Sequence, residues 1–157
     1  MIRRFFAVVA SLAVTAPVVV ALTAAQAGAN VEISFVERQT NTEFVVNGAT
    51  TLQPPAALQP GDRIIFRSDL LQGSTTIGFD NGFCTVEFND NALCEAVFAI
   101  TGKGDFTAIG LLRGLTPSVF DIAVTGGTFA YRNAHGDAHV VQVNSTDANW
   151  TLNLVTG

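Results

Sequence analysis

The sequence is short of positive charge and of familiar catalytic motifs. Its 157 residues include 8 lysines and arginines against 13 aspartates and glutamates. Phosphate binding needs clustered Lys and Arg, so this composition argues against a nucleic-acid partner and against an anionic membrane surface. The chain also contains no G-x-S-x-G turn, no paired-histidine metal motif and no phosphate-binding loop.

Cysteine and histidine are equally scarce, with two of each. Their unrelated spacings provide too few ligands for a metal site, so we predict none. Cys84 and Cys94 flank the segment VEFNDNAL, whose Asn-Asp-Asn run is typical of a turn. A hairpin there would place the two cysteines on neighbouring strands. In an oxidising compartment they would form a disulfide, and the alternative is two buried free thiols.

The N-terminus has the pattern of a secretory signal peptide. Arg3 and Arg4 precede an apolar run that Pro17 interrupts, and Ala25-Gln26-Ala27 fits the small-x-small cleavage rule. We predict a signal peptide over residues 1–27 and a secreted or cell-envelope protein, with a membrane anchor as the alternative. Residues 28–157 would form one domain of net charge −7, with no second hydrophobic span.

The rest of the chain is typical of an all-β protein. No long run shows helical spacing of apolar residues, while Val, Ile, Phe and Thr are frequent and turns recur at short intervals. We expect Gly126-Gly127 and Gly136 to form bulges or corners that let the sheet bend and close. We expect Tyr131 to lead into a strand. The predicted strands are 31–36 (extending towards 46), 63–71, 75–88 with an interruption near Gly82, 92–101, 106–113, 119–125, 134–143 and 149–155, which makes an antiparallel arrangement of about eight.

Several of these strands are apolar on both faces. In one, Ala96, Phe98 and Ile100 alternate with Val97 and Ala99. A monomeric barrel with a wet exterior should alternate more cleanly between apolar and polar residues. A subunit interface is the simplest cover for the second face, so we predict a homo-oligomer, with a second layer of a sandwich as the alternative.

Two segments resemble one known family. GDRIIFRSDLLQGSTTIGFDNGFCTVE covers residues 61–87, and AVTGGTFAYRNAHGDAHV covers residues 123–140. Together they resemble the dirigent and allene oxide cyclase superfamily in its bacterial, secreted branch. Residues 126–136 follow the family pattern G-G-T-G-x-F-R-x-A-R-G without a gap, except that Phe129 replaces a glycine and His135 replaces an arginine.

The resemblance implies an eight-stranded antiparallel β-barrel, commonly a trimer, with a central cavity for a small hydrophobic ligand or substrate. It implies activity without a metal or organic cofactor, in which an apolar pocket holds a flexible molecule in one productive conformation. Polar groups in the pocket would assist proton transfer or stabilise charge.

The resemblance also marks candidate site residues. Asp69, Arg132 and Asp121 are the candidate catalytic residues: Asp69 to accept a proton or stabilise a cation, Arg132 to anchor an anionic oxygen, and Asp121 to pair with Arg132. A surface carboxylate or an ordinary salt bridge is the alternative for each. The candidate ligand contacts are Arg67, Glu87, Tyr131 and His135, for which an interface, core packing or simple exposure is the alternative.

Three functions remain open from the sequence. The first is a cyclase-like or dirigent-like barrel of isomerase type, which steers cyclisation or coupling of its substrate. The second is a non-catalytic binding protein that holds an apolar ligand in the same cavity. The third is a structural barrel without a cavity, which an inward-facing Phe129 would favour.

Overall fold

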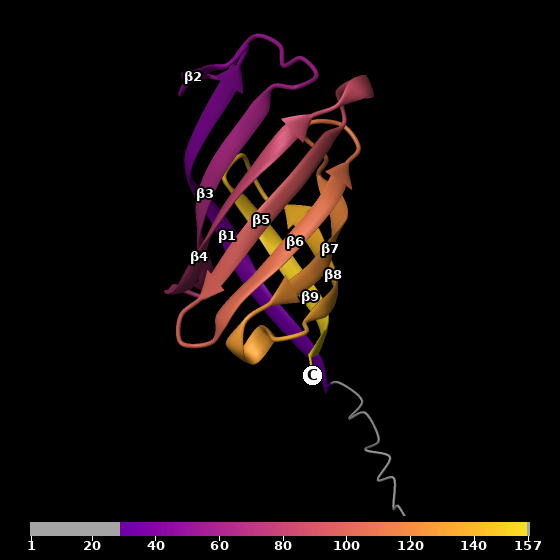
Figure 1. Ribbon diagram of the computed structural model, residues 1–157. Coiled ribbons are helices and arrows are strands. Elements are labelled where there is room, and N and C mark those ends of the chain that lie inside the picture. The colour runs from indigo at the N-terminus through magenta and orange to yellow at the C-terminus, as the bar shows by residue number, and fades with distance from the viewer. Residues whose placement is uncertain (1–28, 157) are drawn as a thin grey trace, which may run out of the picture.

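The structure, a computed structural model, describes residues 29–156. The predicted signal peptide and its cleavage site at Gly28 lie outside the described residues. The two 3-10 helices are η1 (Phe88–Asp90) and η2 (Phe129–Tyr131). The strands (Figure 1) are β1 (Ala29–Val46), β2 (Ala49–Thr51), β3 (Arg63–Gln72), β4 (Thr75–Val86), β5 (Ala92–Ile100), β6 (Gly104–Leu112), β7 (Val119–Gly127), β8 (His135–Gln142) and β9 (Asp147–Thr156).

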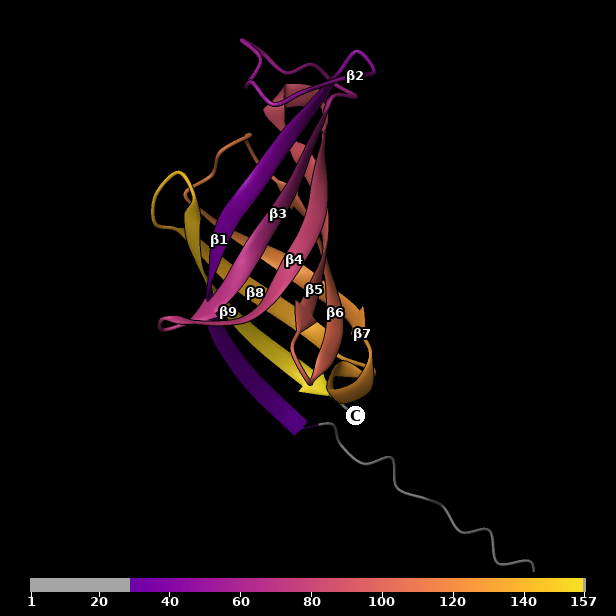
Figure 2. The same cartoon turned by 90° about the vertical axis from the view of Figure 1, so that its left-hand side faces the viewer.

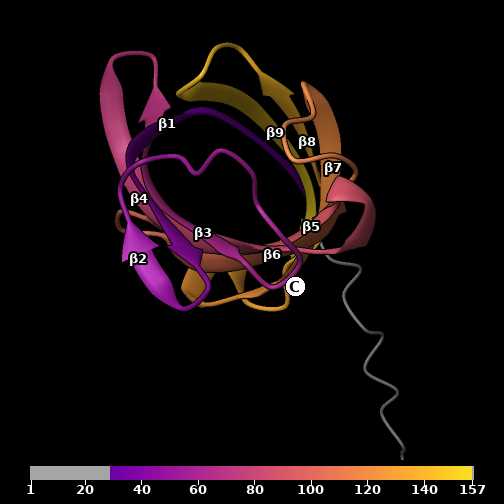
Figure 3. The same ribbon diagram turned by 90° about the horizontal axis from the view of Figure 1, so that it is seen from above.

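Eight of the strands form a closed antiparallel barrel. Strands β3 to β9 pair in chain order, and β1 pairs with both β3 and β9, which closes the sheet on itself. Viewed from above, the strands form a ring (Figure 3). The predicted all-β, eight-stranded antiparallel barrel is confirmed. Neither helix within residues 29–156 is long and apolar enough to cross a membrane.

The long strand β1 joins the two edges of the sheet. Its first part, 29–38, pairs with β9, and its second part, 36–45, pairs with β3, with a register shift between Gln39 and Asn41 (Figure 2). Asn47 and Gly48 then take positive φ values of 51° and 80°, as a tight hairpin turn requires. The chain returns as β2, which pairs with the end of β1. The segment between β1 and β3 therefore contains one short strand.

The glycine predictions are partly wrong. A register shift in the β6–β7 pairing lies beside Gly126, as expected of a bulge. By contrast, β4 runs through Gly82 without a break, and Gly136 pairs in register within β8. Gly136 is needed because β9 passes close by: a Cβ there would lie 2.0 Å from the carbonyl oxygen of Asn153. Tyr131 ends η2 and does not lead directly into a strand.

Aromatic side chains fill the end of the barrel that lies opposite β2. Phe98 and Phe106 stack with ring centroids 4.7 Å apart, and Tyr131 meets Phe106 edge-on at 5.4 Å. Phe98 also contacts Trp150, at 4.8 Å between centroids. Tyr131 belongs to η2, which lies against β6 and β7 at the barrel end opposite β2 (Figure 1). Aromatic packing therefore closes that end of the barrel.

The two cysteines form a disulfide between β4 and β5. Cys84 and Cys94 are directly opposite each other in the antiparallel register, and the sulfurs are bonded. The turn between the strands contains η1 and Asn91. The predicted hairpin and its disulfide are confirmed in the structure.

We predict that this disulfide contributes measurably to stability. It encloses a loop with a sequence separation of 10, so loop-closure entropy gives about 3 kcal/mol. The double variant C84A/C94A should lose about that much free energy of unfolding in urea, compared with the oxidised wild type. Titration of denatured, unreduced protein should find no free thiol. Two titratable thiols, or an unchanged unfolding midpoint in the double variant, would contradict the prediction.

Candidate functional site

A cavity of about 550 Å³ occupies the other end of the barrel. Its mouth is formed by the β6–β7 loop, at 115–118, and the β8–β9 loop, at 143–145. The volume is in the range of small-molecule binding sites, and an eight-stranded barrel is wide enough to hold one such ligand. Its inner wall is largely apolar and aromatic, lined by Ile64, Phe66, Cys84, Cys94, Ala96, Phe98, Leu112, Phe120, Ile122 and Trp150.

One carboxylate lines this cavity among the apolar groups of its inner wall. Glu37 lies on β1 in the same inward alternation as Ile33 and Phe35. Its Oε1 accepts a hydrogen bond of 2.9 Å from the Ser68 hydroxyl on β3. Its Oε2 accepts a hydrogen bond from Nε1 of Trp150 on β9. Its two neighbouring strands, β3 and β9, therefore hold Glu37 in one orientation, while it remains partly accessible from the cavity.

A second carboxyl group lies behind Glu37. Asp80 on β4 is fully buried, opposite Ser68 in the β3–β4 register. Neither of its side-chain oxygens makes a hydrogen bond of normal geometry, although Ser68 and Glu37 lie close to it. Burial, together with the smaller effect of the nearby negative charge of Glu37, raises the pKa of Asp80 to about 8. At neutral pH this group is therefore mainly a neutral carboxylic acid.

The two carboxyl groups titrate as a coupled pair. Burial also raises the pKa of Glu37, while the hydrogen bonds from Ser68 and Trp150 oppose that shift. Since hydrogen bonds from donors favour the ionised form, the charge of the pair resides mainly on Glu37 and the proton on Asp80. The arrangement can supply a base inside an apolar cavity with a protonated acid next to it.

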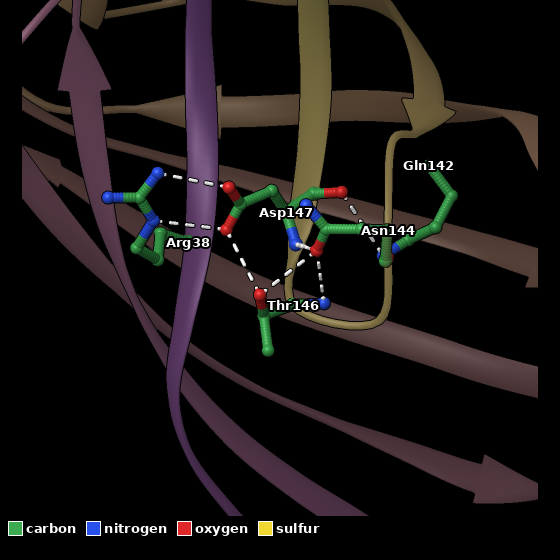
Figure 4. A network of polar contacts seen from close by, with 5 residues as sticks. All are labelled: Arg38, Gln142, Asn144, Thr146 and Asp147. Carbon is green, nitrogen blue, oxygen red and sulfur yellow. Dashed lines mark hydrogen bonds and ion pairs between the residues drawn. The ribbon is translucent and has the colours of Figure 1, made fainter.

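A network of polar contacts fixes the mouth of the cavity (Figure 4). Arg38 donates two hydrogen bonds of 3.0 Å to Asp147, which joins β1 to the start of β9. Oδ1 of Asn144 accepts hydrogen bonds of 2.8 Å from the backbone N–H groups of Thr146 and Asp147. Nε2 of Gln142 donates to the carbonyl oxygens of Asn144 and Asp147, at 2.7 and 3.3 Å. The β8–β9 loop is thus held in one conformation beside the cavity.

The three candidate catalytic residues from the sequence are not among the residues that line this cavity. Asp69 is half-buried on β3, in the alternation opposite to inward-facing Ser68 and Leu70. Asp121 is exposed, and its Oδ1 lies 2.8 Å from Nδ1 of His139, so its predicted pairing with Arg132 is wrong. Arg132 is exposed directly after η2, and no ion pair of residues 29–156 includes it.

The candidate ligand contacts are likewise spread over other parts of the barrel. Arg67 lies 4.6 Å from the ring centre of Phe79 on the outer surface, and Glu87 is half-buried at the end of β4. Tyr131 is buried in the core, where burial raises its pKa. His135 is exposed, with Nδ1 3.0 Å from the carbonyl oxygen of Asn133. The roles assigned to these residues stay predictions, and the geometry of the cavity favours Glu37 instead.

The sequence contained a signal for Glu37 that motif comparison missed. In VEISFVE, the residues Val31, Ile33, Phe35 and Glu37 share one face of the strand. A carboxylate on the apolar face of a strand is a candidate functional group, since burying it is costly. Asp80 gave no comparable signal, because its neighbours on the same face are Gly78 and Gly82. Within residues 29–156, no group of three or more His, Cys, Asp or Glu side chains could hold a metal ion.

Comparisons with known proteins support the fold. The structure is similar to pyocyanin demethylase, with a TM-score of 0.68 and 24% identity over 80% of this chain and all of that one. It is similar to the pterocarpan synthase dirigent protein GePTS1, with a TM-score of 0.69 and 14% identity over 85% of this chain and 88% of that one. It is also similar to the Diels Alderase AbmU from Streptomyces koyangensis, with a TM-score of 0.63 and 13% identity over 80% of this chain and 64% of that one.

The chain has the β-barrel fold of dirigent proteins. This confirms the resemblance seen in the two sequence segments at the level of the fold. No protein-family model matches the sequence, and a search of curated proteins finds no significant match. The dirigent-like barrel therefore fixes the architecture, while the chemistry has to be argued from the cavity.

We predict that Asp80 makes the stability of the barrel depend on pH. Its pKa is about 8 in the folded state, against an ordinary value of 3.8, so between these values the folded state holds a proton that the unfolded state releases. The free energy of unfolding should therefore fall as pH rises from about 4 to 8, by up to about 1.4 kcal/mol per pH unit. D80N, which mimics the neutral acid, should reduce this decrease to the part that comes from Glu37, whose pKa burial also raises.

Urea unfolding of the wild type and of D80N at pH 4.5 to 8 would measure the difference. D105N, at an exposed position of β6, is the matched control and should keep the wild-type slope. Equal slopes for wild type and D80N would show that Asp80 is ionised in the folded protein across this range.

Proposed function

We propose that the protein binds a small, mainly apolar molecule in the barrel cavity and steers its cyclisation or coupling, with Glu37 as the proton-transferring group. The observation that carries the proposal is the carboxylate of Glu37, fixed by Ser68 and Trp150 in the aromatic inner wall of the cavity. An apolar wall orients a flexible substrate, and a base with a raised pKa works well near neutral pH.

The names of structural neighbours support this class of chemistry. One is a Diels Alderase and two are pterocarpan synthase dirigent proteins. Their identities to this chain are between 13% and 17%, so the substrate has to be found by experiment. A non-catalytic carrier of an apolar ligand is the second candidate, because the same cavity would serve it without any proton transfer.

The ketone 2-tetralone is a suitable probe, because it is an apolar bicycle whose acidic carbon-bound protons a carboxylate can remove. Trp150 is the only tryptophan and lies at the cavity wall, so its fluorescence reports binding. Deuterium uptake by 2-tetralone in D₂O, followed by NMR, reports proton transfer. We expect binding and accelerated exchange in the wild type, and about a hundredfold slower catalysed exchange in E37Q with binding retained.

E32Q is the matched control, since Glu32 is an exposed residue of the same strand, and it should behave as the wild type. If 2-tetralone binds but its deuterium exchange is no faster than in buffer, the result supports the non-catalytic carrier and rules out general-base catalysis. Acceleration that survives in E37Q would assign the base to another residue. No response of Trp150 would contradict a ligand cavity altogether.

We also propose that the mature protein is a secreted homo-oligomer, with three subunits as the resemblance implies. The outer surface of β3 to β6 carries exposed apolar side chains among polar ones such as Arg67 and Glu95, with Val97 at 45% and Leu111 at 52% of full exposure. Clusters of exposed apolar side chains rimmed by polar residues often mark contacts with a partner. The patch consists of Ile65, Phe79, Leu93, Val97 and Leu111.

Native mass spectrometry tests the assembly. We expect a trimer for the wild type and a monomer for V97K, because a lysine in the middle of the patch would have to lose its hydration on association. V119K is the control, since Val119 is equally exposed on β7 outside the patch and its replacement should leave the trimer intact. A monomeric wild type at micromolar concentration would refute the proposed interface.

A further inference from the structure

The cavity presents negative charge without compensating positive charge. Among the described residues that line it there is no Lys, Arg or His, and the charged ones are Glu37 and Glu95. Glu95 lies on the exposed side of β5, whereas Glu37 belongs to the inner wall. A ligand with its own carboxylate or phosphate would meet only repulsion and desolvation there.

The cation nearest in sequence cannot neutralise Glu37. Arg38 follows it on β1, so the strand alternation directs its side chain to the outside of the barrel, where 53% of it is exposed. There its guanidinium is bound to both oxygens of Asp147, as Figure 4 shows. Since Asp147 neutralises the positive charge of Arg38, the negative charge of Glu37 remains available to a ligand.

Beside the aromatic rings, the polar atoms that remain available are the acceptors of Glu37. The lining side chains with donor groups come from the loops at the mouth and the β1 bulge beside them, namely Gln39, Thr116, Ser118, Asn144 and Ser145. A carboxylate has about four acceptor positions, and Ser68 and Trp150 fill two of those on Glu37. At the mouth, both N–H groups of the Gln142 side chain are used inside the β8–β9 loop. Gln142 can therefore offer a ligand only its side-chain oxygen. Such a site suits a ligand that donates hydrogen bonds or carries positive charge.

The aromatic wall favours the same kind of ligand. Trp150 and Phe98 lie with ring centroids 4.8 Å apart beside Glu37, and Phe66 and Phe120 line the same cavity. The faces of aromatic rings attract cations, and Trp does so most strongly. A flat cationic ring could place its positive charge near Glu37 and its apolar body against these side chains.

We propose that the ligand of this cavity is cationic, namely an aromatic ring system with a positively charged nitrogen, or an apolar amine in its protonated form. The proposal rests on the proposed ligand-binding function of the cavity and specifies its charge. In the complex, the nitrogen lies beside the Glu37 carboxylate, and the ring packs against Trp150. Anionic ligands of the same shape are excluded.

Three bicyclic probes of similar size test the proposal: N-methylquinolinium (a fixed cation), 1-methylnaphthalene (its neutral isostere) and 1-naphthoate (an anion). Calorimetry gives the affinities, and competition with 2-tetralone for the Trp150 fluorescence signal shows that binding is in the cavity. In the wild type we expect the cation to bind at least tenfold more tightly than the neutral isostere, and the anion more weakly than either.

The variants separate this inference from the proposed function. E37Q should reduce the preference for the cation to less than twofold while the neutral isostere still binds, and E32Q should keep the wild-type preference. Equal affinities for cation and neutral isostere, or a preference that survives in E37Q, would overturn the inference while leaving an apolar binding cavity. Failure of all three probes to bind would overturn the inference and the binding function together.

Discussion

The pairing of β1 with both β3 and β9 is the constraint on which the site depends. It closes the barrel, and it also brings side chains from three strands to one point inside it. Glu37 comes from β1, Ser68 from β3 and Trp150 from β9, and their hydrogen bonds cross both seams of the long strand. An open sheet would separate β9 from β3 by its full width. The site therefore exists only in the closed barrel.

The carboxyl pair is hard to explain as a stabilising feature. Burying an ionisable group costs free energy, and neither oxygen of Asp80 makes a hydrogen bond of normal geometry that would offset this cost. Apolar residues of similar size would fill this part of the wall at lower cost. A structural barrel without a cavity would have no use for Glu37 and Asp80, whereas a binding or catalytic cavity needs a polar group at a fixed position. The cost of the pair thus favours a functional interior.

The sequence predicted the strands and the disulfide well because their signals are local. Gly102 and Gly104 mark one turn, and Cys84 and Cys94 flank another, so neighbouring strands could be paired by inspection. The alternation in VEISFVE marks Glu37 as a residue of the apolar face, but its contact with Asp80 joins strands that are distant in sequence, and no local pattern predicts that contact. Phe129 shows the same limit: it was considered for the barrel interior but is 81% exposed at η2.

The motif that revealed the family resemblance lies away from the cavity. Residues 126–136 surround η2 and bring Tyr131 against Phe106, which closes the opposite end of the barrel. A Cβ at Gly127 would lie 2.5 Å from the carbonyl oxygen of Tyr131, so glycine is needed there for packing. This segment therefore supports the architecture and does not identify the site. The proposed ligand site lies at the other end of the barrel, where the Glu37 carboxylate, the aromatic wall and the β8–β9 loop meet. The family motif contributes no side chain to that cavity, so the motif cannot identify the ligand.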